Sequence, residues 1–203
     1  MTPTPRSTER LMTLQAHWQE LRNRLLLCVI ALIVASCATF EFAGQLYQLI
    51  VHPLESALGP SSTGRKLIFT NLTEGFATHL KVAFYSAFVL VFPFWCYQLY
   101  AFVAPGLRPN ERRLLVTFAL LSPVLFAFGA VFAYFIVSPM LCKFFLSFEN
   151  PAGSLPILLE AKISDYLDLI LDFILAFGLA FQLPVAILAL VMLQIVTHKT
   201  LVK

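Results

Sequence analysis

Charge is the scarcest feature of this sequence. Only 12% of its 203 residues are Asp, Glu, Lys or Arg, whereas 59% are hydrophobic and 20 are phenylalanine. The formal net charge of +3 is small, and the charged residues lie between apolar runs instead of forming a basic stripe. This pattern excludes nucleic acid as the main partner. A compact soluble domain of this length cannot bury so much apolar surface, so the composition predicts a membrane protein surrounded by the lipid bilayer.

The chain also lacks patterns of catalytic and metal-binding residues. Its four cysteines contain no C-x-x-C pair, and its four histidines are scattered over tails and loops without an H-E-x-x-H motif. No nucleophile has a base at helical spacing within the apolar runs. We therefore predict that the protein is not an enzyme and has neither a metal site nor a cofactor.

A removable signal peptide is missing as well. The first 24 residues contain no apolar core followed by a small-residue cleavage site. We expect residues 1–24 to form a cytoplasmic, amphipathic segment, and the first membrane span behind it to act as an uncleaved insertion signal.

Four apolar runs are long enough to cross the hydrocarbon core of a membrane, which takes about 20 residues of helix. The runs cover residues 25–47, 82–103, 114–137 and 166–193. Pro93, Pro123 and Pro184 lie inside the last three runs, where a proline removes a backbone donor and favours a kink. The predicted fold is therefore all-α: a polytopic membrane helix bundle over residues 25–193, with four transmembrane helices kinked at internal prolines.

Basic residues indicate the orientation of this bundle, because Lys and Arg are enriched in cytoplasmic segments. The N-terminal tail, the short loop Ala104–Arg113 and the C-terminus carry nine of the 14 Lys and Arg residues, and the two long loops carry the other five. The N-terminus is therefore predicted to be cytoplasmic. Four spans return the chain to the same side, where residues 194–203 form a cytoplasmic tail.

Two of the predicted cytoplasmic segments place an acidic residue among arginines at the membrane surface. The segment HWQELRNRL contains Glu20 and Arg24, four residues apart on an amphipathic turn. The loop APGLRPNERR contains Glu111 beside Arg112 and Arg113. Each acid has a simple structural explanation, either as an ion pair on a helix surface or as a charge favoured at a helix start. Alternatively, the two acids form a polar site that faces the cytoplasm.

The order of these motifs resembles the TatC family, the multi-spanning subunit of the twin-arginine protein translocase. The similar elements are HWQELRNRL, LKVAFYSAFVLVFPFWCYQLYAFVAPGLRPNERR, FAFGAVFAYFIVSP and FGLAFQLPV, which together extend from about His17 to Val185. The resemblance implies a receptor for the twin-arginine signal peptides of folded cargo, in a bacterial cytoplasmic membrane or an organellar membrane. Members typically have six spans. We therefore expect two short C-terminal spans to be missing, in a fragment, a truncated product or one half of a split gene.

The resemblance also implies roles for individual residues. In that family the acids of the ELR and ERR motifs help to bind the arginines of the signal peptide, and here they match Glu20 and Glu111. A carboxylate suits this role because it accepts a guanidinium through two hydrogen bonds. The neighbouring residues expected to shape the loop and its topology are Arg22, Phe102, Pro105, Arg112 and Arg113.

Partners within the membrane are implied in the same way. Many relatives carry a glutamate where this chain has Gln182, and that acid is associated with docking single-span subunits of the TatA and TatB type. The amide keeps hydrogen-bonding capacity but loses the charge. We expect Gln182 and Pro184 to dock such helices, with the chain forming a homo-oligomer within a hetero-complex. Pro53 and Pro93 are expected to be structural.

Other polar residues leave one alternative function open. Asp165, Asp168 and Asp172 recur at helical spacing and predict a water-exposed acidic stripe, and Lys81 is expected to extend to the outer membrane interface. Kinked helices with carboxylates also suit a secondary transporter of small molecules or ions. Against this alternative, the charged groups lie at the ends of the spans, and no inverted repeat is visible.

Overall fold

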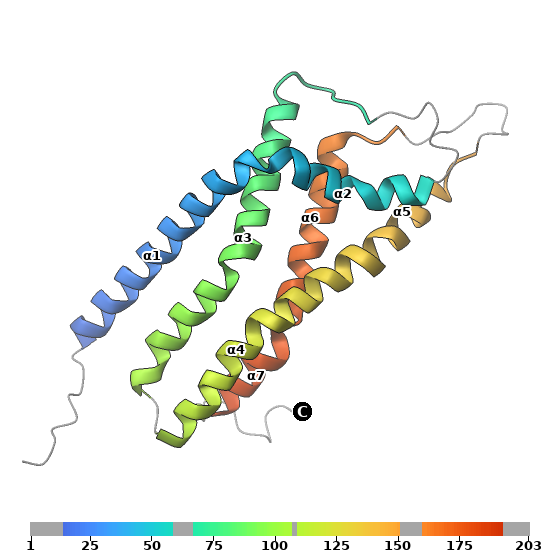
Figure 1. The fold of residues 1–203 in the computed structure, drawn as a ribbon. Coiled ribbons are helices and arrows are strands. Elements are labelled where there is room, and N and C mark those ends of the chain that lie inside the picture. The colour runs from blue at the N-terminus through green and yellow to red at the C-terminus, as the bar shows by residue number, and fades with distance from the viewer. Residues whose placement is uncertain (1–13, 59–66, 107–108, 151–159, 193–203) are drawn as a thin grey trace, which may run out of the picture.

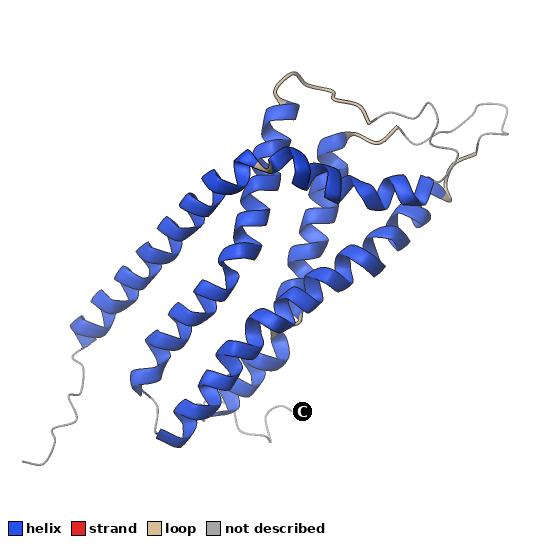
Figure 2. Cartoon of the chain, viewed as in Figure 1, coloured by secondary structure: helices blue, strands red, loops and turns tan. Residues whose placement is uncertain are grey.

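The fold is built from helices. The computed structural model describes residues 14–58, 67–106, 109–150 and 160–192 (Figure 1, Figure 2). In chain order, the elements are α1 (Leu14–Glu41), α2 (Ala43–Leu58), α3 (Glu74–Val103), the short 3-10 turn η2 (Ala104–Gly106), α4 (Pro109–Phe132), the π-helical turn η3 (Ala133–Val137), α5 (Ser138–Leu146), α6 (Ile163–Ala180) and α7 (Leu183–Met192). An isolated parallel β-bridge joins Ile68 to Lys162. The predicted all-α fold is confirmed.

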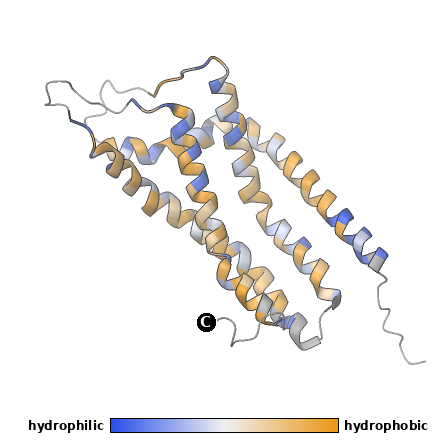
Figure 3. Ribbon diagram, turned by 180° about the vertical axis from the view of Figure 1, so that it is seen from behind, coloured by the Kyte–Doolittle hydropathy of each residue, from blue (hydrophilic) through white to orange (hydrophobic). Residues whose placement is uncertain are grey.

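Among the described residues, four stretches of helix are long and apolar enough to cross a membrane, which is the number predicted. They are His17–Glu41, Glu74–Val103, Leu115–Leu146 and Ile163–Ala189. Helix α1 packs along α3, and α4 packs against both α3 and α6 (Figure 1). Hydrophobic residues dominate the lengths of these helices in Figure 3. In the most apolar 18-residue stretch of the first span, only 6% of the residues are buried within the protein. Most of this stretch is therefore available to lipid.

The helix that contains the first span begins and ends earlier than the apolar run assigned to that span. Helix α1 starts at Leu14 and stops at Glu41, whereas the predicted range was 25–47. No proline or glycine separates the amphipathic segment from the apolar run, so one helix continues through both. At the other end the chain turns at Phe42, whose N–H bonds the carbonyl of Thr39 at 3.1 Å.

Helix α2 lies where the sequence predicted the start of a long loop. It crosses one end of the bundle, hereafter the far end, where α3 and α6 begin (Figure 1). Its buried residues include Ile50, Val51, Pro53 and Leu54, and it packs against α3, α5 and α6. A short helix with only one apolar face does not stand out in a search for long apolar runs, which explains the difference.

The prolines inside the spans act in different ways. Helices α3 and α4 continue unbroken through Pro93 and Pro123. Helix α6 instead ends shortly before Pro184, which lies in the first turn of α7. The π-helical turn η3, which the sequence did not predict, comes just before Pro139, and the helix then continues into α5 beyond the predicted end of the third span. Proline lacks the N–H that a regular helix needs, so a local change in helix geometry beside it is expected.

Pro53 has a specific consequence in α2. It has no N–H, so the carbonyl of Leu49, four residues earlier, has no helical donor. The hydroxyl of Tyr134 in η3 donates to this carbonyl at 2.7 Å. The hydroxyl of Tyr166 in α6 donates to the next carbonyl, that of Ile50, at 3.0 Å. Two tyrosines thus hold α2 across the far end of the bundle.

We predict that Tyr134→Phe destabilises the protein mainly when Pro53 is present. In the parent, the change leaves the Leu49 carbonyl without its donor, which costs about 0.5–1.5 kcal/mol. In a Pro53→Ala background the alanine N–H restores the helical bond, and the same change should cost much less. Thermal unfolding of the parent, the two single variants and the double variant in detergent measures this coupling. Equal losses in the two backgrounds would contradict this role of Pro53.

Helices α4 and α6 cross closely, which explains why two positions in the apolar motifs are glycine. A Cβ at Gly129 would lie 2.7 Å from the carbonyl oxygen of Phe177, and a Cβ at Gly178 would lie 2.6 Å from the ring of Phe126. The Phe126 ring is almost fully buried and stacks on Phe92 with ring centroids 3.9 Å apart. Small residues allow such close helix contacts in membranes, so these glycines set the spacing of α4 and α6.

Candidate functional site

The predicted site residues lie at the end of the bundle where α1 begins, α3 ends and α4 begins, hereafter the near end (Figure 1). The helices α1, α3 and α4 and the turn η2 carry Glu20, Arg22, Phe102, Pro105, Glu111, Arg112 and Arg113. Two segments that are far apart in the sequence, residues 20–22 and 102–113, therefore contribute to one end of the protein.

Glu20 is held by Arg24, one turn further along α1. The guanidinium donates from Nε at 3.0 Å and from Nη2 at 2.6 Å, and both bonds end on the same carboxylate oxygen, Oε1. The other oxygen, Oε2, is enclosed and has no hydrogen-bond partner among the described residues. The predicted ion pair is present, but it satisfies only one oxygen of the carboxylate, and a buried polar atom without a partner is exceptional in proteins.

Arg24 is in turn attached to α3. Its remaining terminal nitrogen, Nη1, donates to the side-chain oxygen of Gln98 at 2.9 Å. Gln98 is only 9% exposed. This contact joins residues 74 positions apart, so the spacing of the sequence did not predict it. A chain of hydrogen bonds thus leads from Glu20 through Arg24 to a buried residue of the second span.

Aromatic contacts hold the same two helices together. Phe102 stacks on His17 at the start of α1, with ring centroids 4.3 Å apart and an interplanar angle of 18°. Deeper in the bundle, Trp95 donates from Nε1 to the carbonyl of Cys28 at 3.2 Å. These contacts lie on either side of Gln98 along α3, so they fix the position of α1 at the level of Glu20.

The second acidic segment begins α4. Pro109 is its first residue, a position where the missing N–H costs no helical bond. Glu111 follows in the first turn, where the helix dipole favours an acid. The side chains of Glu111 and Arg112 lie outside the described part of the structure. The remaining predicted residues Arg22, Pro105 and Arg113 are exposed.

The predicted docking residue Gln182 lies between α6 and α7 and bonds α4. The Ser122 hydroxyl donates to the amide oxygen of Gln182, and the amide nitrogen donates to the Ser122 carbonyl at 2.9 Å. The Cys96 thiol donates to the same serine hydroxyl at 3.4 Å. An amide can donate twice and accept twice, so these bonds use half of its capacity. Pro184 is exposed nearby in α7.

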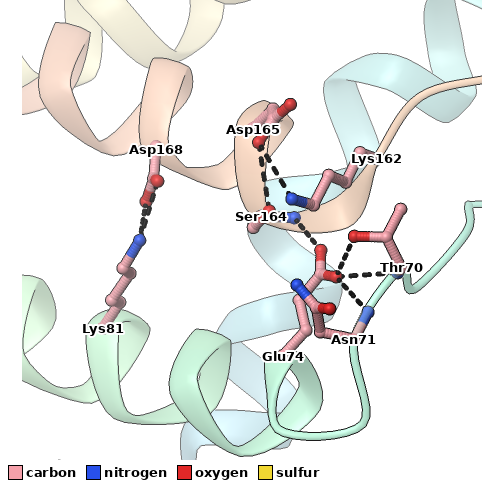
Figure 4. Close-up of polar contacts among 8 residues, drawn as sticks. All are labelled: Thr70, Asn71, Glu74, Lys81, Lys162, Ser164, Asp165 and Asp168. Atoms are coloured by element: carbon pink, nitrogen blue, oxygen red, sulfur yellow. Dashed lines mark hydrogen bonds and ion pairs between the residues drawn. The ribbon is translucent and has the colours of Figure 1, made fainter.

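A polar network that the sequence did not predict joins α3 to α6 at the far end (Figure 4). The carboxylate of Glu74 is buried and accepts hydrogen bonds from the N–H of Thr70 at 2.8 Å and of Ser164 at 3.2 Å. The N–H of Ile163 donates to the Ile68 carbonyl at 3.2 Å. The bonds from Ser164 and Ile163 satisfy two N–H groups at the start of α6 that have no partner within the helix. Glu74 therefore caps a helix from another part of the chain.

An ion pair lies further along the same two helices (Figure 4). The Lys81 ammonium is 2.8 and 2.7 Å from the two carboxylate oxygens of Asp168, and each side chain is 43% exposed. The Tyr85 hydroxyl donates to Asp172 at 2.7 Å. From the sequence we expected Lys81 to extend to the outer interface and the aspartates to form a water-exposed stripe. Asp165 and Asp172 are exposed and Asp168 is partly exposed, and two of the three aspartates also bond side chains of the neighbouring span.

Comparisons with known proteins agree with the motifs. The model of the family described as Sec-independent protein translocase protein (TatC) matches residues 16–203. The Sec-independent protein translocase protein TatC of Rickettsia prowazekii is 38% identical over 194 residues, which are 96% of this chain and 76% of that protein. The protein of the same name from Escherichia coli strain K12 is 38% identical over 197 residues, or 97% and 74% of the two chains. The crystal structure of a twin-arginine translocase receptor, TatC, matches with a TM-score of 0.79 and 29% identity, over 92% of this chain and 79% of that one. The chain therefore belongs to the TatC family of Sec-independent protein translocase subunits.

Proposed function

We propose that the near end of this translocase subunit binds the paired arginines of signal peptides, with Glu20 as a central acceptor. The observation that carries the proposal is the Oε2 atom of Glu20, which is enclosed and has no donor in the part of the chain that the structure describes. An unpaired buried oxygen is unfavourable, and a guanidinium from a bound peptide would supply the missing N–H. The Glu20 side chain as a whole is 20% exposed, so a peptide reaches Oε2 after a small turn of this side chain.

The surrounding residues complete the proposed site. Glu111 supplies a second carboxylate from the first turn of α4, on the strength of its match to the ERR motif. The arginines at positions 22, 112 and 113 repel cations that do not make specific hydrogen bonds, while Phe102 and Pro105 shape the surface next to the membrane. Selectivity for arginine follows because a planar guanidinium bonds carboxylates in a fixed geometry that an ammonium cannot reproduce.

The proposed orientation places the near end in the cytoplasm. It is supported by the nine Lys and Arg residues that the sequence places in the two tails and the short loop, against five in the long loops. Residues 1–13 and 193–203 lie outside the described residues. A cytoplasmic near end would meet signal peptides before transport, as a receptor for precursors requires.

Site-specific photocrosslinking tests the proposed function. A photoreactive residue in place of Gln19, which is exposed beside Glu20 on α1, should crosslink to a twin-arginine precursor. The same precursor with two lysines should give a much weaker product. A probe in place of Asn71, which is exposed at the far end, serves as the matched control and should give none. Equal crosslinking of the arginine and lysine precursors at Gln19 would contradict the proposal.

We further propose that Gln182 and Pro184 dock single-span subunits of the TatA and TatB type, in an assembly with more than one copy of the chain. Gln182 supports this because half of its hydrogen-bonding capacity is unused by Ser122. An interhelical hydrogen bond in a membrane is worth roughly 1 kcal/mol, so Gln182→Leu should weaken co-purification of the small subunits about fivefold, and Gln182→Glu should preserve it. Ser122→Ala, which keeps the Gln182 amide, is the control. Unchanged co-purification with Gln182→Leu would remove this role.

A further inference from the structure

Arg24 contacts Glu20 in an uncommon way for an arginine and a carboxylate. Such pairs frequently form two parallel hydrogen bonds, one to each carboxylate oxygen. Here Nε and Nη2 lie 3.0 and 2.6 Å from the same oxygen, Oε1, and no described residue donates to Oε2. The parallel arrangement would pair both oxygens, so a further contact must favour the observed one.

That contact is made by Gln98 on α3. Its side-chain oxygen accepts a hydrogen bond from Nη1 of Arg24 at 2.9 Å. The guanidinium is planar and rigid, so fixing Nη1 also fixes the directions in which Nε and Nη2 donate. Gln98 is buried, and α3 is held to α1 by the stacking of His17 on Phe102. The acceptor therefore stays in place while Arg24 contacts Glu20.

We propose that Gln98 is a positioning residue that keeps Arg24 on one oxygen of Glu20 and thereby leaves the other oxygen for an arginine of the signal peptide. This inference rests on the proposed function of Glu20 and adds the residue that controls access to its carboxylate. Without Gln98, Arg24 turns to pair with both oxygens, and a peptide arginine has to displace it. The net charge of the site is the same in both cases.

Binding of a fluorescent twin-arginine signal peptide to the full chain in nanodiscs tests this role. Gln98→Leu, which replaces the amide with an apolar side chain of similar size, should weaken binding about fivefold to tenfold. Gln98→Glu keeps an acceptor for Nη1 and should bind at least as tightly as the parent. Equal thermal unfolding temperatures of the variants would show that the binding change does not come from loss of the fold.

The decisive comparison repeats Gln98→Leu in an Arg24→Lys background. Lysine keeps the positive charge, but its ammonium lacks the planar fork that links Gln98 to Glu20. Gln98→Leu should therefore change binding less than about twofold in this background. An equal loss in both backgrounds would show that Gln98 acts through packing, and would overturn the inference.

Glu20→Gln distinguishes failure of the inference from failure of the proposed function. If Glu20→Gln binds the peptide like the parent, the proposed role of Glu20 is wrong, and the role of Gln98 falls with it. If Glu20→Gln weakens binding but the effect of Gln98→Leu does not depend on Arg24, only the positioning role is wrong. If Glu20→Gln weakens binding and the effect of Gln98→Leu also depends on Arg24, Gln98 acts through Arg24 on Glu20 as proposed.

Discussion

Reversing the charge of both proposed acceptors, Glu20→Lys together with Glu111→Lys, should abolish binding of twin-arginine precursors. The change replaces two attractive carboxylates with two ammonium groups that repel the peptide arginines. Removing one partner of a desolvated charged pair costs roughly 2–5 kcal/mol, and much less at an exposed rim. For a site between these limits, each single change to alanine should weaken binding about tenfold to a hundredfold, and each change to lysine should weaken it further.

The measurement is peptide binding to membranes that carry equal amounts of each variant. Insertion of the protein should be preserved, because removing an acid from a segment that we propose to be cytoplasmic only increases its positive bias. Glu41→Lys is the matched control, since Glu41 is an exposed acid at the opposite end of α1. If the variants at Glu20 and Glu111 bind like the parent, these carboxylates serve packing and topology, and the proposed site is wrong.

The sequence predicted the number of spans because hydropathy is a local property that can be summed along the chain. Helix α2 escaped prediction because only one of its faces is apolar, and its position depends on tyrosines from two later helices. A proline's effect also depends on its surroundings. Pro93 lies within an unbroken helix, whereas Pro53 leaves the Leu49 carbonyl to the Tyr134 hydroxyl. The residues next to each proline in the sequence do not predict either outcome.

The same distinction applies to the polar residues. The pair of Glu20 and Arg24 was predictable because the two residues stand four positions apart on one helix. The third member of this group, Gln98, comes from another span. Only the packing of α1 on α3 brings it within hydrogen-bonding distance of Arg24. The motifs thus name the two acidic segments that lie at the near end, and the structure adds how the donors and acceptors of α1 and α3 are distributed there.

The family also decides between the two functions that the sequence left open. A TatC protein is a subunit of the twin-arginine translocase, a transport component and not an enzyme, and this sets aside a secondary transporter of small molecules or ions. The acids that had favoured a transporter include Asp168 and Asp172. They bond Lys81 and Tyr85 of the neighbouring span, so they connect two helices of the bundle.

Removing one member of the Lys81 and Asp168 pair should destabilise the bundle more than removing both. Asp168→Leu leaves an ammonium within a membrane span without its counter-charge. For a deeply buried pair the loss is several kcal/mol, and the partial exposure of these side chains reduces it to about 1–3 kcal/mol. The double variant Lys81→Leu with Asp168→Leu contains neither charge, and two apolar side chains at this position should recover most of the loss.

Thermal unfolding in detergent of the parent, both single variants and the double variant measures this difference. The pair Lys162 and Asp165 is a suitable control, because its atoms are 3.8 Å apart and the Asp165 side chain is 75% exposed. Breaking such an exposed pair should change stability by less than about 1 kcal/mol. If the double variant instead loses as much as the two single variants combined, Lys81 and Asp168 stabilise the bundle independently. The link between α3 and α6 would then depend on Glu74 and on the bond from Tyr85 to Asp172, which remain intact in all of these variants.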